Sequence, residues 1–233
     1  MIALLMSLMT LQCAPPSSKR AEEVRARVGP VLRKDLEAKD LVFGAPVFMR
    51  IFKESRELEV WVEHEDGRFR LFKTYAIAAY SGSLGPKLAE GDGQAPEGFY
   101  YVPAKRMHPT SSYHLAFNLG YPNAYDRAHG RTGSFLMVHG NRVSIGCYAM
   151  TDARIEEIYT LADAALRAGQ PFFRVHCFPF RMTPTRLGKL AKGEPKWATF
   201  WANLKEGYDH FELHGVPPNV TVKDGRYQFS GAE

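Results

Sequence analysis

The sequence predicts an α+β domain that is rich in strands and carries most of its helices in the C-terminal half. Apolar and polar residues alternate in stretches between residues 46 and 139, turn residues separate these stretches, and helical periodicity prevails after residue 150. With 233 residues, of which 45% are hydrophobic, the chain can bury a substantial core. No apolar run reaches the roughly 18 residues that a membrane-spanning helix needs, so an integral membrane protein is not expected.

Residues 1–18 predict a signal peptide. The uncharged segment MIALLMSLMTL is followed by a polar stretch before the first charge at Lys19, and its length matches the apolar region of such a signal. Export is therefore expected. A lipoprotein acylated at Cys13 is the less favoured alternative, because Gln12 before it is not the small residue that a lipoprotein signal carries.

Residues 19–43 predict a helical arm outside the core, broken into two short helices at Gly29-Pro30. A domain over residues 44–180 follows. Alternation from residue 46 predicts two or three strands in hairpins, with a turn at Glu65-Asp66-Gly67. Residues 81–96 are too rich in glycine and proline for a regular element, and GFYYV after them predicts another strand.

Two more strands are predicted at residues 113–120 and 134–139, separated by an irregular polar stretch. Thr151 is expected to cap a helix that Gly169 ends, and residues 171–178 predict a strand. Residues 181–233 predict an extension packed on the domain, made of a short helix from Thr183, an aromatic helix and a hairpin. On the aromatic helix we expect core side chains rather than a sugar platform, namely Trp197, Phe200 and Trp201.

The charge pattern argues against a nucleic-acid partner. Thirty Lys and Arg residues against 25 Asp and Glu residues give a net charge of +5, but the basic residues are dispersed rather than gathered in one block. An anionic cell wall suits this charge equally well. Lys87 is expected either to contact an anionic substrate or to be solvated.

Cys147 and His139 are the candidate catalytic residues. His139 ends an apolar strand, and Cys147 precedes the predicted helix, whose N-terminal N–H groups would stabilise a thiolate and an oxyanion. A nearby histidine could accept the thiol proton. The alternative is that Cys147 is a small buried apolar residue and His139 a structural one.

The segment His139-Gly140 followed by Ser144-Ile145-Gly146-Cys147 resembles the signature of the L,D-transpeptidase catalytic domain (YkuD-like) family. AAYSG at residues 78–82 and APEGFY at residues 95–100 resemble an earlier signature of that family. The segments PEGFY, NAYDRAHG, MVHG, VSIGCYAMTD and FPFRMT together resemble its YafK/DpaA branch, over residues 44 to 229.

This resemblance implies a β-sandwich-like catalytic fold, no cofactor, a periplasmic location and peptidoglycan stem peptides as substrate. Carried onto this sequence, it makes Cys147 the nucleophile and His139 the base. Gly146 and the N–H groups of Cys147 and Tyr148 become candidates for the oxyanion hole, and Ser144 is expected to order their loop.

The sequence also departs from typical family members. Ile145 stands where they carry a second histidine, Tyr148-Ala149-Met150 stands where an Arg or Asn follows the cysteine, and the spacing from His139 to Cys147 is shorter. These departures match the branch associated with hydrolysis at meso-diaminopimelate, which releases Braun-type lipoprotein from peptidoglycan. The alternatives are a transpeptidase that forms diaminopimelate cross-links or attaches lipoprotein, and a peptidoglycan-binding module with a degenerate site.

Asp126, Arg127 and His129 resemble the AYDRAHG segment of the branch and, with Gly140 and Ser144, are the expected substrate-binding residues. An Asp/Arg pair suits the zwitterionic centre of diaminopimelate, because Arg binds a carboxylate in bidentate fashion. Alternatively, Asp126 and Arg127 pair with each other to hold a loop, and His129 orients His139.

No metal is expected. His129, His139 and Cys147 could contribute to a zinc site, but no fourth ligand is evident. The alternation around Cys177 predicts that it is buried, and whether it pairs with Cys147 stays open.

Overall fold

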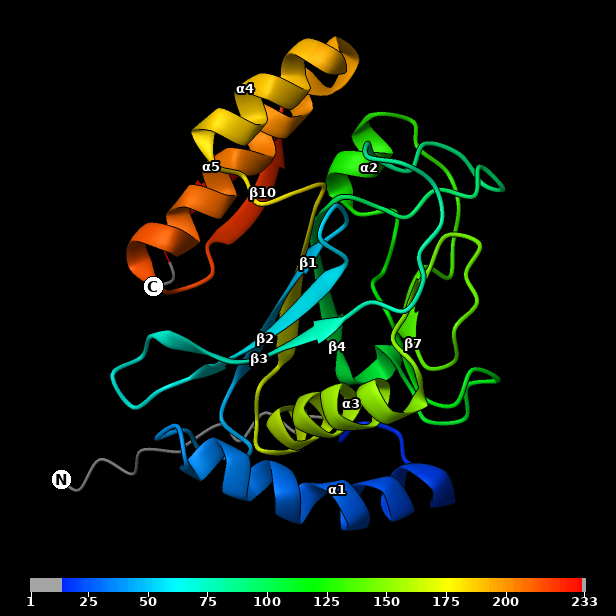
Figure 1. The fold of residues 1–233 in the computed structure, drawn as a ribbon, viewed down its shortest axis with the longest axis vertical. Helices are drawn as coiled ribbons and strands as arrows, with labels where there is room; N and C mark the ends of the chain where they lie inside the picture. Colours follow the sequence, from blue (N-terminus) through cyan, green and yellow to red (C-terminus); the bar gives the residue numbers. More distant parts are fainter. Residues whose placement is uncertain (1–13, 232–233) are drawn as a thin grey trace, which may run out of the picture.

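The computed structural model describes residues 14–231 and confirms the α+β class (Figure 1). Cys13 and most of the predicted signal peptide lie outside the described residues. A five-stranded sheet forms the middle of the molecule, with α4 (Pro184–Gly193) and α5 (Ala198–His214) on one side and α1 (Lys19–Glu37) running beside α3 (Asp152–Arg167) at the other end. None of the helices in this part of the chain is both long and apolar enough to cross a membrane.

The five-stranded sheet has the strand order β3-β2-β1-β9-β4. Its strands are β1 (Val47–Phe52), β2 (Glu57–Glu63), β3 (Phe69–Ala76), β4 (Gly98–Pro103) and β9 (Phe172–Phe178). β1 and β9 run parallel, and the other neighbours are antiparallel. Every residue of β1 is buried because both faces of the sheet are covered.

A four-stranded sheet packs against the first through apolar side chains. It has the order β5-β6-β7-β8, formed by β5 (Met107–His108), β6 (Ala116–Asn118), β7 (Met137–His139) and β8 (Tyr148–Ala149). Phe117 of β6 meets Phe173 of β9 edge to face, with ring centroids 5.2 Å apart, inside the main core. The arrangement is therefore sandwich-like, with β6 and β7 shorter than the predicted strands.

Helix α1 is continuous, so the predicted break at Gly29-Pro30 is wrong. Pro30 lies on the exposed side, where the carbonyl that it leaves unpaired can bind water, while Leu32 and Leu36 beyond it are buried near α3. The same burial corrects the expectation of an arm outside the core: Val24, Leu32 and Leu36 belong to the main apolar core. Packing of the apolar face outweighs the cost of one proline.

Two helix N-termini differ from the prediction. Thr151 precedes α3 with a φ of 75° and makes no capping hydrogen bond through its side chain, whereas the carboxylate of Asp152 accepts a hydrogen bond from the Asn141 N–H at 2.7 Å. In the stretch expected to be irregular, α2 (Ala124–Ala128) forms because Asn123 and Asp126 make a reciprocal capping box.

The C-terminal residues cover the other face of the five-stranded sheet. The chain ends in a hairpin of β10 (Asn219–Lys223) and β11 (Arg226–Ser230). Two short 3-10 helices also occur: η1 (Ala104–Arg106) follows β4, and η2 (Pro195–Trp197) precedes α5. Phe200 and Trp201 of α5 are buried in a second aromatic core with Phe52 and Phe178, as predicted, and Trp197 packs at its margin.

A buried ion pair joins the glycine-rich loop to this second core. The Lys53 ammonium donates to the carboxylate of Glu97 at 3.0 Å and to the carbonyls of Gly85 and Ala95. The indole N–H of Trp201 donates to the other Glu97 oxygen at 3.0 Å. Every charge in this group therefore has a partner, which the burial of an ion pair requires.

Candidate active site

The candidate catalytic residues lie at two neighbouring parallel strands: His139 ends β7, and Cys147 directly precedes β8. β7 pairs with β8 so that Val138 opposes Tyr148, and both of these side chains face the core. His139 and Cys147 are thereby placed on the opposite face, because side chains alternate along a strand. One pocket of about 210 Å³ brings the following residues together: Tyr113, His139, Val143, Ser144, Ile145 and Cys147.

His139 is buried, and its ring is oriented from two sides. Its Nδ1 lies 2.5 Å from the carbonyl oxygen of Gly140, and the Tyr113 ring packs on it with centroids 4.7 Å apart. A carbonyl only accepts, so Nδ1 carries the proton and Nε2 is left as the basic nitrogen. Burial lowers the pKa of His139, although the hydrogen bond to Gly140 opposes that shift.

Only glycine fits at position 140, because neighbouring atoms leave no room for a Cβ. A Cβ at this position would lie 2.6 Å from the carboxylate of Asp152 and 2.7 Å from the carbonyl oxygen of Tyr113. The Gly140 N–H donates to Leu115 at 3.1 Å. Gly140 thus positions the carbonyl that holds His139 and admits the loop that carries Tyr113. The structure places it behind the histidine, and it does not line the pocket.

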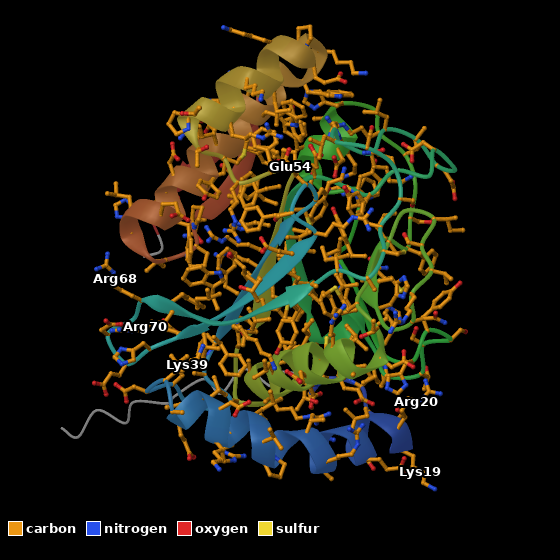
Figure 2. All side chains as sticks on the ribbon, in the orientation of Figure 1. Lys19, Arg20, Lys39, Glu54, Arg68 and Arg70 are labelled. Atoms are coloured by element: carbon orange, nitrogen blue, oxygen red, sulfur yellow. The ribbon has the colours of Figure 1, made fainter. Side chains whose placement is uncertain are left out.

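The N-terminal end of α1 holds that same loop. The Ser18 hydroxyl donates to the carbonyl of Pro109 at 2.8 Å, and Arg20 donates to the carbonyls of Ser111 at 2.9 Å and His114 at 2.6 Å. Figure 2 shows Lys19 and Arg20 together at this end of the helix, far from Lys39 at its other end. Helix α1 therefore supports the segment from which Tyr113 reaches His139.

The environment of Cys147 differs from the prediction. Its Sγ accepts a hydrogen bond from the Met137 N–H at 3.4 Å and lies 3.6 Å from the carbonyl oxygen of Phe135. Strand β8 lies between Cys147 and α3 in the chain, and the N–H group that reaches the sulfur belongs to Met137 rather than to the α3 N-terminus expected from the sequence. Burial raises the pKa of the thiol, and the Met137 N–H and the Lys87 ammonium only partly offset this. The resting group is a neutral thiol.

Ser144 orders the turn before Cys147. Its hydroxyl accepts from the Gly146 N–H at 3.2 Å and donates to the Cys147 carbonyl at 2.7 Å, while Gly146 has a φ of 127° that favours glycine. The Gly146 N–H is thus already used, which leaves the backbone N–H of Cys147 as the better oxyanion donor. The Tyr148 side chain is buried, and its hydroxyl donates to Pro96 at 2.6 Å, so only its main chain could serve there.

Apolar side chains surround the pocket. Ile145 is 91% exposed, and Phe135 and Val143 are also exposed beside Cys147. In the sequence, Ile145 stands out only as a departure from typical family members, and Tyr113, Phe135 and Val143 were not predicted to belong to the site. No local motif marks these three residues, because the pairing of β6, β7 and β8 brings them to the site.

Lys87 does not face solvent, which corrects the expectation of a solvated lysine. It is buried and pairs with the carboxylate of Asp92 at 2.5 Å and the carbonyl of Ala89 at 2.8 Å. The ammonium of Lys87 and the N–H groups of residues 88, 89 and 94 outweigh burial and lower the pKa of Asp92 to about 2. The glycine-rich loop is therefore internally braced.

Asp126 and Arg127 do not line the Cys147 pocket. Asp126 is buried and accepts hydrogen bonds from Arg131 at 2.8 Å, from the Tyr100 hydroxyl at 3.0 Å and from the Asn123 N–H at 3.1 Å. Arg127 is exposed and donates to the carbonyl of Pro122. The two residues therefore do not pair with each other: Arg131 is the partner of Asp126, and this pair holds α2.

His129 also lies outside the pocket. Its ring stacks on Tyr125 with centroids 4.1 Å apart, and its Nδ1 lies 2.9 Å from the Tyr125 carbonyl, next to Gly225 of the C-terminal hairpin. It does not orient His139. Residues 14–231 contain no group of three or more acidic, histidine or cysteine side chains able to hold a metal ion. Cys177 is buried in β9, as predicted, and neither it nor Cys147 forms a disulfide.

Comparison with known proteins places this arrangement in a family. The model of the L,D-transpeptidase catalytic domain (YkuD) matches residues 52–215, a span that contains both His139 and Cys147. The chain belongs to this family. The two candidate catalytic residues, His139 and Cys147, line one pocket at the four-stranded sheet.

Related sequences agree with this assignment. The chain is 47% identical over 194 residues to YafK of Escherichia coli K12, whose name places it among the L,D-transpeptidases; the match spans 83% of this chain and 78% of YafK. YafK of Escherichia coli O157:H7 matches equally.

Solved structures with similar folds include Pgp2 of Campylobacter jejuni, described as a helical cell shape determining protein. Its K307A mutant is 23% identical, with a TM-score of 0.46 over 69% of this transpeptidase-family chain and 56% of Pgp2. The chain thus spans just over half the length of Pgp2. Bd1075 of Bdellovibrio bacteriovorus is 16% identical, with a TM-score of 0.40 over 79% of this chain and 84% of Bd1075.

Proposed function

We propose that this protein is a periplasmic cysteine hydrolase that cuts peptidoglycan at meso-diaminopimelate, at the bond that links a Braun-type lipoprotein to the wall. Membership of the L,D-transpeptidase family supports peptidoglycan stem peptides as the substrate class. The observation that carries the proposal is the single pocket in which Cys147 lies with a buried His139 whose Nδ1 is held by Gly140. The similarity to YafK covers this whole region.

The reaction begins from two neutral groups. Nε2 of His139 takes the thiol proton as Cys147 Sγ attacks the carbonyl carbon of the diaminopimelate L-centre. The N–H of Cys147 stabilises the oxyanion. The C–N bond breaks, the amine leaves with the proton from His139, and an acyl thioester remains on Cys147. Water, deprotonated by His139, then attacks the thioester and yields a carboxylic acid and the free thiol.

Hydrolysis and transpeptidation differ only in the molecule that attacks the thioester, which is water in the first case and an amine in the second. The hydrolytic assignment rests on the departures from typical family members, above all Ile145, an apolar and almost fully exposed side chain at the mouth of the pocket. We infer that the wall of this site offers an incoming amine no polar anchor at that position, so that water resolves the thioester.

The test is product analysis by mass spectrometry after incubation with sacculi that bear or lack bound lipoprotein. The unmodified protein should release lipoprotein, or its terminal-lysine peptide, and Cys147→Ala should release none. Cys177→Ala is the matched control, because it removes a free cysteine that is buried outside the pocket. Its fold is verified by thermal unfolding. Full release by Cys147→Ala would refute the mechanism, and new cross-links or amine exchange would identify a transpeptidase.

A second candidate function is a peptidoglycan-binding module with an inactive site. The raised pKa of Cys147 and the strand that separates it from α3 favour this alternative, because neither activates the thiol. Retained binding to sacculi, with no product from either substrate, would support it and exclude the hydrolase.

A further inference from the structure

A second hollow lies between the five-stranded sheet and the C-terminal hairpin. The paired strands β4 and β9 form its floor, and β10 and β11 form its opposite wall. Its volume of about 420 Å³ falls in the range of small-ligand pockets, roughly 300–1,000 Å³. None of its lining residues lines the Cys147 pocket. We call this hollow the hairpin groove.

Arg174 of β9 supplies a cation to the floor of the hairpin groove. Its guanidinium donates to the Asn219 side chain at 2.6 Å and lies over the ring of Phe172 at 5.1 Å. Within residues 14–231 the hydrogen-bond partner of this guanidinium is the Asn219 amide rather than a carboxylate, and burial lowers the pKa of Arg174. A half-buried cation without a counter-charge is unfavourable in the free protein, and an anion would relieve that cost.

His176 lies one step along the same face of β9. Its side chain is 1% exposed and packs edge to face against Phe48 and Phe99, with ring centroids 4.7 Å away in each case. The ring lines the hairpin groove, yet its Nδ1 has no hydrogen-bond partner among residues 14–231. Burial and the nearby arginines lower the pKa of His176, so the ring is neutral and adds no positive charge beside Arg174.

An adjoining hollow of about 160 Å³ extends the groove. The two share Tyr100, Tyr101 and Asn123 on their walls, and the extension adds the guanidinium groups of Arg106 and Arg127. Both of these arginines donate to backbone carbonyls rather than to carboxylates. Neither hollow is lined by an Asp or Glu side chain. The three arginines of this path, Arg106, Arg127 and Arg174, therefore have no carboxylate as hydrogen-bond partner within residues 14–231.

We propose that the hairpin groove and its extension bind an acidic peptide, with an apolar side chain against the aromatic floor and carboxylates on Arg174 and Arg127. Planar guanidinium groups match carboxylates in geometry as well as in charge. Tyr101 and Phe172, whose rings meet edge to face at 5.3 Å, provide the apolar surface. The site is separate from the proposed chemistry at Cys147, and its occupancy can be measured without turnover.

The test is isothermal titration calorimetry of the full chain with N-acetyl-phenylalanyl-glutamate and with its neutral counterpart, N-acetyl-phenylalanyl-glutamine amide. The acid should bind at least about tenfold more tightly, since the two probes differ only in their carboxylates. Arg174→Gln should abolish that difference. Arg70→Gln is the matched control, because it makes the same charge change on the distant β2–β3 hairpin (Figure 2).

Two further variants keep the outcome decisive. Arg127→Gln alters an exposed residue, leaves folding unaffected and should weaken acid binding a few-fold even if Arg174→Gln unfolds. Cys147→Ala should bind the acid as tightly as the unmodified chain. Equal binding of acid and amide, no binding of either, or an equal loss in Arg70→Gln and Arg174→Gln would overturn the proposal. Loss of binding in Cys147→Ala would instead place the peptide at the catalytic pocket and overturn it as well.

Discussion

His139 and Cys147 line the same pocket as a neutral base and a neutral acid. Burial lowers the pKa of the imidazole and raises that of the thiol, so the ion pair typical of many reactive cysteines is disfavoured at rest. In the proposed mechanism the thiolate forms only with bound substrate, when the sulfur proton moves to Nε2. This behaviour could not be predicted from sequence, where Cys147 was expected at a helix N-terminus.

The alkylation rate of Cys147 should follow from this pairing. Because its pKa lies above the usual value, the rate with iodoacetamide should climb about tenfold per pH unit from pH 7 to 9 and continue to rise beyond. Mass spectrometry of the peptide containing Cys147 measures the rate at this site alone. A plateau already at pH 7 would contradict the neutral resting thiol.

Gly140→Ala should impair catalysis more than stability. The new methyl group would meet the Asp152 carboxylate and the Tyr113 carbonyl, shift the carbonyl that holds His139, and lower product release about 100-fold, as expected for a displacement of about 1 Å. Gly29→Ala is the control, since nothing lies within 4 Å of its added Cβ. Unchanged activity in Gly140→Ala would show that the close contacts relax freely.

A local sequence pattern was enough to predict the roles of some residues but not of others. The His-Gly and Ser-x-Gly-Cys spacing predicted the pair at the pocket, because adjacent strand ends carry it. Asp126 and His129 looked like substrate ligands, but their partners Arg131 and Tyr125 make them supports of α2. Only tertiary contacts reveal that difference.

At the scale of elements, packing outweighed local preference in several places. Helix α1 passes through Pro30 because its far half is buried, and β6 and β7 are shorter than their apolar patterns. The capping box at Asn123 was present in the sequence as Asn-x-x-Asp and could have predicted α2. The amphipathic pattern of α3 and the alternation of β9 were sufficient to predict both.

The contact between α1 and the loop before β6 predicts an effect of the helix on catalysis. Arg20→Ala removes the hydrogen bonds to Ser111 and His114, loosens the loop that presents Tyr113, and should lower turnover several-fold. Lys19→Ala is the matched control, because Lys19 is exposed and makes only a long 3.8 Å pair with Glu23. Equal activity of the two variants would show that the contacts of α1 with this loop do not affect catalysis.

In the molecule as a whole, the five-stranded sheet separates two surfaces. One face packs on the sheet that carries Cys147, and the other on α5 and the hairpin that borders the second groove. The α+β class and the strand-rich first half were predictable from periodicity. The pairing of β1 with β9 across more than a hundred residues was not, because no local pattern encodes a distant partner.

The buried Lys53–Glu97 pair should make the free energy of unfolding depend on Trp201, which is distant in sequence but donates a hydrogen bond to Glu97. Trp201→Phe retains the aromatic packing but leaves one Glu97 oxygen without its donor, which should cost about 1–3 kcal/mol of unfolding free energy. Urea unfolding measures this difference. Trp197→Phe is the control, because its ring packs only at the margin of the second core. Equal stability of the two variants would rule out a structural role for the indole N–H.

The neutral resting thiol has a further consequence, for the lifetime of the enzyme. Peroxides and disulfides react with thiolates far faster than with thiols. In the periplasm, the location that we propose, the protein would meet oxidants that cytosolic reductants do not remove. A thiol that is deprotonated only when substrate is bound is therefore protected from oxidation between turnovers. The same burial that slows the reaction of Cys147 with a reagent would preserve the thiol for the reaction that we propose.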